Sequence, residues 1–595
     1  MLLTPIDWGI VFLFFVVSLV VGLLVTKKAG SSTAEYFVAG RSMPWWLLGV
    51  SMVATTFSTD TPNLVTNIVR KNGVSGNWVW WAFLLTGMLT VFVYARLWRR
   101  SNLLTDLEFY ELRYSGRSAA FLRGFRAIYL GVFFNIIVMA SVSLAAIKIG
   151  SVLLQLTPLQ TILIACTITV IYSTLGGLRG VLYTDLFQFC MAMVGAVGAA
   201  IVALRHPAVG GLTNLLSHPE VRDKLAFFPD FLAKDQRQMV IAVFLMPIMV
   251  HWWSVWYPGS EPGGGSYIAQ RMLAAKDEKH ALGSVFFFNA AHYALRPWPW
   301  IIVALCSLAV FPNLDALREA FPHAASVVND DLGYPAMLTF LPAGLLGLVV
   351  ASLIAAYMST ISTHLNWGAS YLVNDFYARF LRPKSSEKEL IHVGRIVTVL
   401  LMIFAGALAL VMESALDNFN IILMVGAGTG LIFILRWFWW RINAASEITA
   451  MTVSFIIAIY FRFVHTRIGL TPVEDWMQLL MSIGITTVAW LLMTYLTRPV
   501  DEETLCNFYK HIRPGGPGWK KINVLIDDKE CSTSGRQLPQ GILCMILGCI
   551  AIYAALFATG YFIYGRYILG TTLGLLSIIC SVALTFSWKR LITEN

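Results

Sequence analysis

Residues 57–63 read Phe-Ser-Thr-Asp-Thr-Pro-Asn and interrupt an otherwise apolar segment that runs from about residue 44 to about residue 66. Pro62 lacks a backbone N–H and its ring clashes with the preceding turn, so a regular helix cannot pass through it. Another apolar segment, at 238–258, runs into residues 257–266, which read Tyr-Pro-Gly-Ser-Glu-Pro-Gly-Gly-Gly-Ser. Paired interruptions in two halves of a membrane chain indicate the solute and ion site of a transporter. The alternative is a proline kink plus an ordinary loop.

The composition indicates that lipid rather than water surrounds most of the chain. Of the 595 residues, 57% are hydrophobic and 13% are charged, and the mean hydropathy is +0.69. Soluble domains carry about 25% charged residues. The net charge of +10 comes from basic residues in short loops, a pattern that sets membrane orientation rather than one that binds nucleic acid. The eight cysteines show neither paired nor metal-like spacing, so we expect no metal cofactor. Six of them lie in apolar segments and are expected to be packing residues: Cys166, Cys190, Cys306, Cys544, Cys549 and Cys580.

The apolar segments predict an all-α integral membrane protein. Segments of about 20 apolar residues span the ~30 Å hydrocarbon core, and only helices satisfy their own backbone groups there. About fifteen such segments are present, at 5–26, 44–66, 78–97, 125–156, 159–178, 181–204, 238–258, 280–311, 335–378, 392–412, 418–436, 448–465, 475–496, 539–564 and 566–587.

The positions of the basic residues predict the orientation. Lys and Arg cluster at 27–41, 96–123, 379–388 and 436–441, after the first, third, ninth and eleventh segments. These connections share one side if the N-terminus is outside, and the positive-inside rule makes that side the cytoplasm. An odd number of segments then places the C-terminus in the cytoplasm. The basic residues at 205–237 disagree, but they lie in a longer loop, where the rule is weaker.

Asp60 is an acidic side chain at membrane depth, where an ionised group costs at least ~2.5 kcal/mol. It therefore needs a cation, a partner or water. One interpretation is a carboxylate that caps N–H groups freed by the break, and the other is a contact with an ion or a solute. We favour the second. Ser58 and Thr61 flank Asp60, and their carbonyls lose helical partners at the break, so they can face a cation.

Residues 356–363 read Ala-Tyr-Met-Ser-Thr-Ile-Ser-Thr inside a long apolar segment. Sodium is a hard cation that prefers oxygen ligands. At about 100° per residue, Ser359, Ser362 and Thr363 fall within one arc, and Thr360 lies on the other side of Ser359. One helix thus offers hydroxyls to two adjoining cavities, with Ser359 shared. The alternative is that these hydroxyls bond back to preceding carbonyls or join neighbouring helices.

A third polar stretch begins at the Gly176-Gly177 pair, where two apolar segments meet in a tight turn. Asp185 and Gln188 follow, one turn apart on the same face near the start of the next helix. Asp185 is thus either a helix N-cap or a member of a buried polar site.

Together these stretches resemble the sodium:solute symporter family over about residues 6–500. The motifs that carry the resemblance are Glu-Tyr-Phe-Val-Ala-Gly-Arg at 35–41, Thr-Asp-Leu-Phe-Gln at 184–188, Gln-Arg-Met-Leu-Ala-Ala-Lys at 270–276, Met-Ser-Thr at 358–360 and Asn-Asp-Phe-Tyr at 374–377. The resemblance implies a LeuT-like core of ten helices in two inverted repeats of five. We expect a leading helix and loop at 1–43, the core at 44–436, and further helices at 437–595 with a solvated cytoplasmic connector near 497–538.

The resemblance also implies where sodium binds. The family's common site, between core helices 1 and 8, would use the carbonyls of Ser58, Thr61 and Ala356 and the hydroxyls of Ser359 and Thr360. Asp60 matches a position at which some members carry an acid important for coupling. A second site, present in some members, would use Asp185, Ser359, Ser362 and Thr363. We therefore expect sodium as the coupling ion, with two ions per cycle.

The solute is less defined than the ion. Candidate contacts are Asn135 on core helix 3, Trp252, Trp253, Trp256 and Tyr257 on core helix 6, and Arg296 on core helix 7. The aromatic residues have packing or an interfacial belt as their alternative role. Asn135 matches a polar solute position of sugar-transporting relatives, but the acid that those relatives use on core helix 2 is missing. Sugar specificity is therefore not inferred, and sugars, carboxylates and amino acids stay open.

The sequence thus predicts a sodium-coupled symporter that imports a small polar solute across the plasma (inner) membrane by alternating access. The alternative is a transporter-like membrane sensor without net transport. We expect no enzyme, because neither HExxH nor G-x-S-x-G is present. A passive channel would differ from a symporter in failing to move solute against its gradient.

Overall fold

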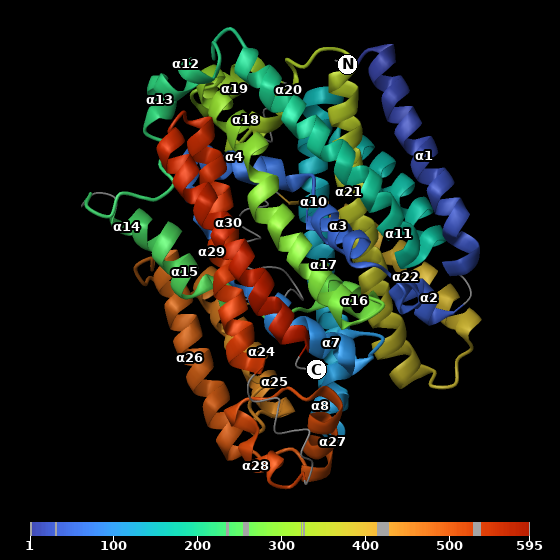
Figure 1. Ribbon diagram of the computed structural model, residues 1–595. Coiled ribbons are helices and arrows are strands. Elements are labelled where there is room, and N and C mark those ends of the chain that lie inside the picture. Colours follow the sequence, from blue (N-terminus) through green and yellow to red (C-terminus); the bar gives the residue numbers. More distant parts are fainter. Residues whose placement is uncertain are drawn as a thin grey trace.

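The computed structural model describes residues 3–29, 32–56, 58–233, 237–253, 261–322, 324, 328–412, 426, 428–526 and 537–593. Apart from one isolated bridge between Met43 and Ala275, these residues form helices, turns and loops (Figure 1). Ten stretches within them are long and apolar enough to cross a membrane: Val74–Ser101, Gly116–Leu154, Leu178–Arg205, Glu278–Val310, Leu345–Leu381, Glu387–Ala409, Ala444–Val464, Asp475–Leu496, Leu538–Ile563 and Tyr567–Lys589.

Four shorter apolar helices match four more predicted segments: Pro5–Ser18, Trp45–Thr56, Pro158–Ile171 and Arg237–Met249. The remaining prediction, at 418–436, is described at 426 and 428–436, where α24 (Gly430–Leu435) is helical. The all-helical membrane fold is therefore confirmed.

Eight helices build the candidate site: α3 (Trp45–Thr56), α4 (Asp60–Asn72), α10 (Asn135–Ile149), α11 (Pro158–Arg205), α16 (Ser266–Ala274), α17 (Glu278–Ala290), α18 (Pro297–Val310) and α21 (Leu345–Ser370). α21 is the central one. Nearly all of its residues are buried, and it packs against α11, α10, α3, α1 (Pro5–Ala29) and α22 (Glu387–Ala409).

Both predicted interruptions are present. α3 ends at Thr56 and α4 begins at Asp60, so Pro62 lies in the first turn of a new helix, where its missing N–H needs no partner. At the other interruption, residues 254–260 lie outside the described part of the chain, residues 261–265 are not helical, and α16 begins at Ser266. Gly263 and Gly264 have φ angles of +89° and +96°, which L side chains rarely adopt.

Both halves of α11 pack against α21. In the first half, Cys166 Sγ lies 3.9 Å from the Tyr357 hydroxyl. In the second half, Asp185 bonds Ser359 and Leu345 lies beside Gly198, so the two sequences run in opposite directions there. α11 is one helix over Pro158–Arg205, so the tight turn predicted at Gly176-Gly177 does not appear as the end of one helix and the start of another.

The C-terminal helices are α25 (Ala444–Ile459), α26 (Asp475–Leu496), α27 (Glu502–Ile512), α29 (Gln537–Ile563) and α30 (Tyr567–Thr593). α29 and α30 lie side by side along one flank of the molecule (Figure 1). α12 (Leu212–Ser217) and α19 (Leu314–Ala320) lie at the end that carries the N-terminus, and α8 (Phe109–Arg113) and α27 lie at the opposite end.

The expectation of a solvated connector near 497–538 is wrong for its described helical part. α27 buries Leu505, Phe508, Tyr509 and Ile512 on one face and packs against α7 (Ala95–Ser101) and α8. The Arg113 guanidinium of α8 lies 5.3 Å from the Phe508 ring centre. An amphipathic helix of this kind is held by its apolar face, so this segment is part of the folded body.

Candidate sodium and solute sites

The break between α3 and α4 is fastened to α21 by two hydroxyls. Thr360 donates to the carbonyl of Thr55 at 2.8 Å, and Thr59 donates to the carbonyl of Leu353 at 3.2 Å. The last carbonyls of a helix have no partners within it, so Thr360 satisfies one at the end of α3, whereas Thr59 bonds a carbonyl in the middle of α21. Ala356 precedes Thr360 by one helical turn, which places both on the same face of α21.

The side chains of the break also bond within the break. Ser58 donates to the carboxylate of Asp60, and its backbone N–H donates to the Thr61 hydroxyl at 3.3 Å. Thr61 in turn donates to the carbonyl of Thr56 at 3.3 Å. Asp60 is the first residue of α4, where the positive end of the helix dipole favours its charge. The structure thus brings Ser58, Asp60 and Thr61 together on the polar face of the break.

The second predicted set lies on the neighbouring side of α21. Asp185 is fully buried, and its two carboxylate oxygens accept hydrogen bonds from Ser51 at 2.5 Å and from Ser359 at 2.6 Å. Thr363 lies 3.2 Å, oxygen to oxygen, from Thr55. Ser362 differs from the prediction, because its hydroxyl donates back to the carbonyl of Ser359 at 3.1 Å.

Three polar side chains in this second set were not predicted: Ser51, Thr55 and Arg271. Arg271 of α16 is fully buried and donates to Ser51 at 3.0 Å and to Thr363 at 2.9 Å. The sequence contains a feature that could have indicated each of these three residues. Ser51 and Thr55 are one helical turn apart in an apolar segment, and Arg271 is a permanent charge in a segment that flanks a predicted break.

Arg296 binds the backbone of α3 rather than facing an open pocket. It donates to the carbonyls of Val53 at 2.9 Å and of Thr56 at 3.0 Å. A cation at a helix C-terminus satisfies carbonyls that have lost their partners and interacts favourably with the helix dipole. The prediction of Arg296 as a solute contact is therefore not supported in this conformation.

The side chain of Asn135 also bonds to another residue of the protein. Its side-chain amide donates to the carbonyl of His364 at 2.9 Å, and its oxygen lies 2.5 Å from Nδ1 of the same histidine. Asn135 is fully buried and therefore joins α10 to α21, instead of lining an accessible solute pocket as predicted.

The aromatic candidates divide into two groups. Trp253 packs with Met246 and Leu479, against α26, and the ring of Trp252 lies 5.9 Å from it. Neither residue reaches the polar clusters around α21 in the described structure, so for these two the packing interpretation holds. Trp256 and Tyr257 lie outside the described residues.

A small cavity with both apolar and polar lining lies between the second core helix, the residues after the second break and α17. Its volume is about 30 Å³, and its polar lining comes from Thr86, Thr90, Glu261, Asn289 and Tyr293. The Asn289 carbonyl oxygen and the Thr86 hydroxyl are buried and have no hydrogen-bond partner among the described residues. Buried polar atoms rarely stay unsatisfied, so this cavity is suited to water or to a polar ligand.

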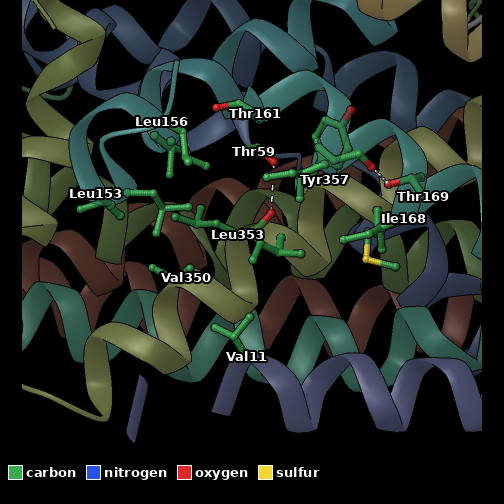
Figure 2. Close-up of a pocket in the computed structure, with 18 of the residues that line it drawn as sticks. Val11, Thr59, Leu153, Leu156, Thr161, Ile168, Thr169, Val350, Leu353 and Tyr357 are labelled. Atoms are coloured by element: carbon green, nitrogen blue, oxygen red, sulfur yellow. Dashed lines mark hydrogen bonds between the residues drawn. The ribbon is translucent and has the colours of Figure 1, made fainter. Parts of the chain in front are cut away.

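A larger pocket lies on the other side of the first break and is almost wholly apolar. Figure 2 shows Val11 of α1, Leu153, Thr161 and Ile168, and Val350 and Tyr357 of α21 around it. Its volume is about 170 Å³, and the Thr59–Leu353 hydrogen bond lies beside it. Apolar walls offer little to a polar solute, so the smaller cavity is the better candidate for the solute site.

Near α8, ion pairs join segments that are far apart in the sequence. Glu261 pairs with Arg126 and, at 2.8 Å, with Arg436. Glu111 accepts from Arg123 at 2.6 Å and from Arg379 at 2.9 Å. Burial opposes ionisation of Glu111, but the hydrogen bonds from the two arginines outweigh it and lower its pKa.

Comparison with known proteins places the chain among transporters. The model of the sodium:solute symporter family matches residues 36–454. The sodium/glucose cotransporter of Vibrio parahaemolyticus is 26% identical over 518 residues, which cover 84% of this chain and 92% of that protein. The sodium/myo-inositol cotransporter 2 of Oryctolagus cuniculus is 26% identical over 558 residues, which cover 84% of this chain and 78% of that protein.

A solved structure shares the fold. The substrate-bound, outward-open structure of a Na⁺-coupled sialic acid symporter superimposes with a TM-score of 0.65 at 20% identity, and covers 84% of this chain and 99% of that one. The predicted LeuT-like fold is confirmed. The protein is a multi-pass membrane transporter rather than an enzyme, sodium is its coupling ion, and it belongs to the sodium:solute symporter family.

Proposed function

We propose that the protein uses sodium to drive uptake of a small, neutral, polyhydroxylated solute of the sugar or cyclitol class. The observation that carries this proposal is the pair of unsatisfied polar atoms, on Asn289 and Thr86, in the small cavity. A solute hydroxyl both donates and accepts, so it suits an amide oxygen and a threonine hydroxyl together. The names of the relatives from Vibrio and rabbit, which refer to glucose and myo-inositol, support the same class.

The charges around the cavity favour a neutral solute. Glu261 is the acidic group in the lining, and Arg126 and Arg436 already neutralise it. The cavity of about 30 Å³ holds about one water molecule. Solute entry therefore requires that the helices around it move apart, which is the motion of alternating access.

In this proposal, sodium binds at two places beside α21. The first lies between α21 and the break that separates α3 from α4, with the carbonyls of Ser58, Thr61 and Ala356 and the hydroxyls of Ser359 and Thr360. The second contains Asp185, Ser359, Ser362 and Thr363. Asp60 supplies negative charge beside the first site. Sodium that binds more tightly to the outward-facing state shifts the population toward it and prepares the solute pocket.

The arrangement of the chain follows from the same proposal. Residues 44–436 form the transport core, 1–43 supply a leading helix, and 437–595 add further helices. The N-terminus faces outward and the C-terminus faces the cytoplasm of the plasma membrane, because the basic residues after α7 and around α8 mark the inner side.

The test is uptake into proteoliposomes of the purified full chain under an inward sodium gradient. Labelled glucose, mannose and myo-inositol represent the proposed class, and alanine and succinate represent amino acids and carboxylates. We expect accumulation of a polyhydroxylated solute that stops when choline replaces sodium. Sodium-driven accumulation of alanine or succinate alone would overturn the proposed solute class.

A pair of isosteric variants tests the cavity. Thr86→Val removes the unsatisfied hydroxyl and should raise the solute concentration for half-maximal uptake about tenfold, since a lost hydrogen bond to a buried group costs about 1–1.5 kcal/mol. The matched control is Thr572→Val on α30, whose hydroxyl is exposed and bonds only its own helix at Ile568 among the described residues. Equal kinetics for the two variants would place the solute elsewhere.

A further inference from the structure

The buried carboxylate of Asp185 has a permanent cation beside it. Nη2 of Arg271 lies 3.9 Å from Oδ2 of Asp185, and both side chains are fully buried. The Ser51 hydroxyl bridges the two, because it donates to Oδ2 of Asp185 at 2.5 Å and accepts from Nη2 of Arg271 at 3.0 Å. Arg271 thus supplies a positive charge at the place where the second sodium ion is proposed to bind.

The same guanidinium also occupies the oxygen atoms around the carboxylate. Nη2 donates to Thr363 at 2.9 Å and to Thr55 at 3.3 Å, and Nε donates to Ser51 at 3.2 Å. On its other side, Nη1 donates to Gln270 at 3.3 Å. Of the proposed sodium ligands, Thr363 is therefore turned toward an N–H group of Arg271, as are the neighbouring hydroxyls of Ser51 and Thr55.

Arginine and sodium exclude each other at this site. Both require a lone pair of the Thr363 hydroxyl, and a guanidinium has only donors to offer. Their like charges also repel strongly in a buried environment of low dielectric constant. The side chains present therefore fit a second sodium ion only after Arg271 has withdrawn.

We propose that Arg271 is a tethered cation that replaces the second sodium ion at Asp185 when the carrier is empty. This inference rests on the proposed function and adds a step to its cycle. A carrier that has released its ions must return with Asp185 still buried, and an uncompensated charge in a membrane interior is costly. Arg271 neutralises it. When a sodium ion arrives, it displaces the guanidinium toward Gln270 and Tyr267 of its own helix.

The location of the two charges links this exchange to movement. Arg271 lies on α16, directly after the second break, whereas Asp185 and Thr363 lie on α11 and α21, which pack together along their length. A shift of α16 relative to α11 and α21 changes the distance between the guanidinium and the carboxylate without changing the Asp185–Ser359 contact. The occupant of the site therefore depends on the conformation of the carrier.

The first test uses sodium alone as the probe. Purified full-length protein is titrated with NaCl against choline chloride, and the unfolding temperature reports binding, because a ligand stabilises the state it binds. In Arg271→Gln the competing charge is absent, so the sodium concentration for half-maximal stabilisation should fall about tenfold. The matched control is Arg99→Gln, which removes a cation that donates to the carbonyl of Ala275, at the end of α16, without touching Asp185.

A second variant covers the case in which Arg271→Gln does not fold. Thr55→Val removes one acceptor of Arg271 and none of the proposed sodium ligands, so it should also bind sodium more tightly than wild type. If sodium binding is unchanged or weaker in the folded variants, Arg271 does not compete with sodium and the inference is overturned.

The third measurement separates the empty-carrier step from the loaded one. In proteoliposomes, exchange with sodium and labelled glucose or myo-inositol on both sides uses only the loaded carrier. Net uptake into a sodium-free interior also requires the empty carrier to return. The ratio of exchange to net uptake should rise about tenfold or more in Arg271→Gln, and an unchanged ratio contradicts the inference. Absence of sodium-driven uptake in wild type would instead refute the proposed function.

Discussion

Thr360 on α21 donates its hydroxyl to the carbonyl of Thr55, at a distance of 2.8 Å, one residue before α3 ends. This contact joins the break to the central helix at the place where the first sodium ion is proposed to bind. A cation at this site would add a second link between the same two elements. The state of the break and the occupancy of the ion site are therefore coupled through one hydroxyl group.

Thr360→Val should reduce the apparent affinity for sodium about tenfold or more, because valine keeps the shape of the side chain but offers no oxygen. Asp60→Ala, and Ser359→Ala combined with Thr360→Ala, should abolish sodium stimulation. The measurement is uptake as a function of sodium concentration in proteoliposomes. The control is Thr398→Val on α22, an equally buried threonine that bonds the carbonyl of Gly394 in its own helix. Wild-type sodium dependence in Thr360→Val would remove this residue from the site.

Arg296→Gln should destabilise the protein even when no solute is present. The guanidinium satisfies the carbonyls of Val53 and Thr56 at the end of α3, and an unsatisfied buried acceptor costs about 1–3 kcal/mol. The unfolding temperature of the purified protein in a solute-free buffer checks this. If Arg296→Gln keeps the wild-type stability but no longer binds solute, Arg296 would instead be a solute contact, as the sequence predicted.

Lys148 and Asp331 form a buried ion pair, with Nζ of Lys148 2.7 Å from the carboxylate. Lys148→Met leaves Asp331 buried without its partner, and a broken buried pair costs about 3–5 kcal/mol. The double variant Lys148→Met with Asp331→Asn should recover most of that loss, because neither charge is left alone. Thermal unfolding of the single and double variants measures the coupling. A double variant no more stable than the single one would show that the two residues act independently.

The sequence predicted the breaks because proline and glycine restrict the backbone locally. Pro62 cannot follow a continuous helical turn, and Gly263 and Gly264 adopt positive φ angles that few other residues tolerate. The geometry of one helix also predicted that Ser359 and Thr360 have different partners, and in the structure they contact Asp185 and Thr55.

The partners that Arg296 and Asn135 have in the structure could not be predicted, because they include main-chain carbonyls. Val53, Thr56 and His364 supply these carbonyls, and the side-chain sequence gives no information on which helix ends need a donor. The packing of α27 was missed for a different reason. Its apolar residues follow the helical spacing i, i+3, i+4, i+7 from Leu505 to Ile512, but the surrounding glycines and charges outweighed that pattern.

The last prediction concerns pH. The pKa of Glu111 is lowered from 4.5, because hydrogen bonds from Arg379 and Arg123 outweigh the effect of burial. A carboxylate with a lowered folded-state pKa contributes stability above its unfolded-state pKa, and this contribution is lost as the pH falls through the folded value. The unfolding temperature should therefore decrease as the pH falls below 4.5, and Glu111→Gln should reduce that decrease. Glu319→Gln, at an exposed position on α19, is the control. If both variants follow the wild-type curve, the arginines do not stabilise the ionised form of Glu111.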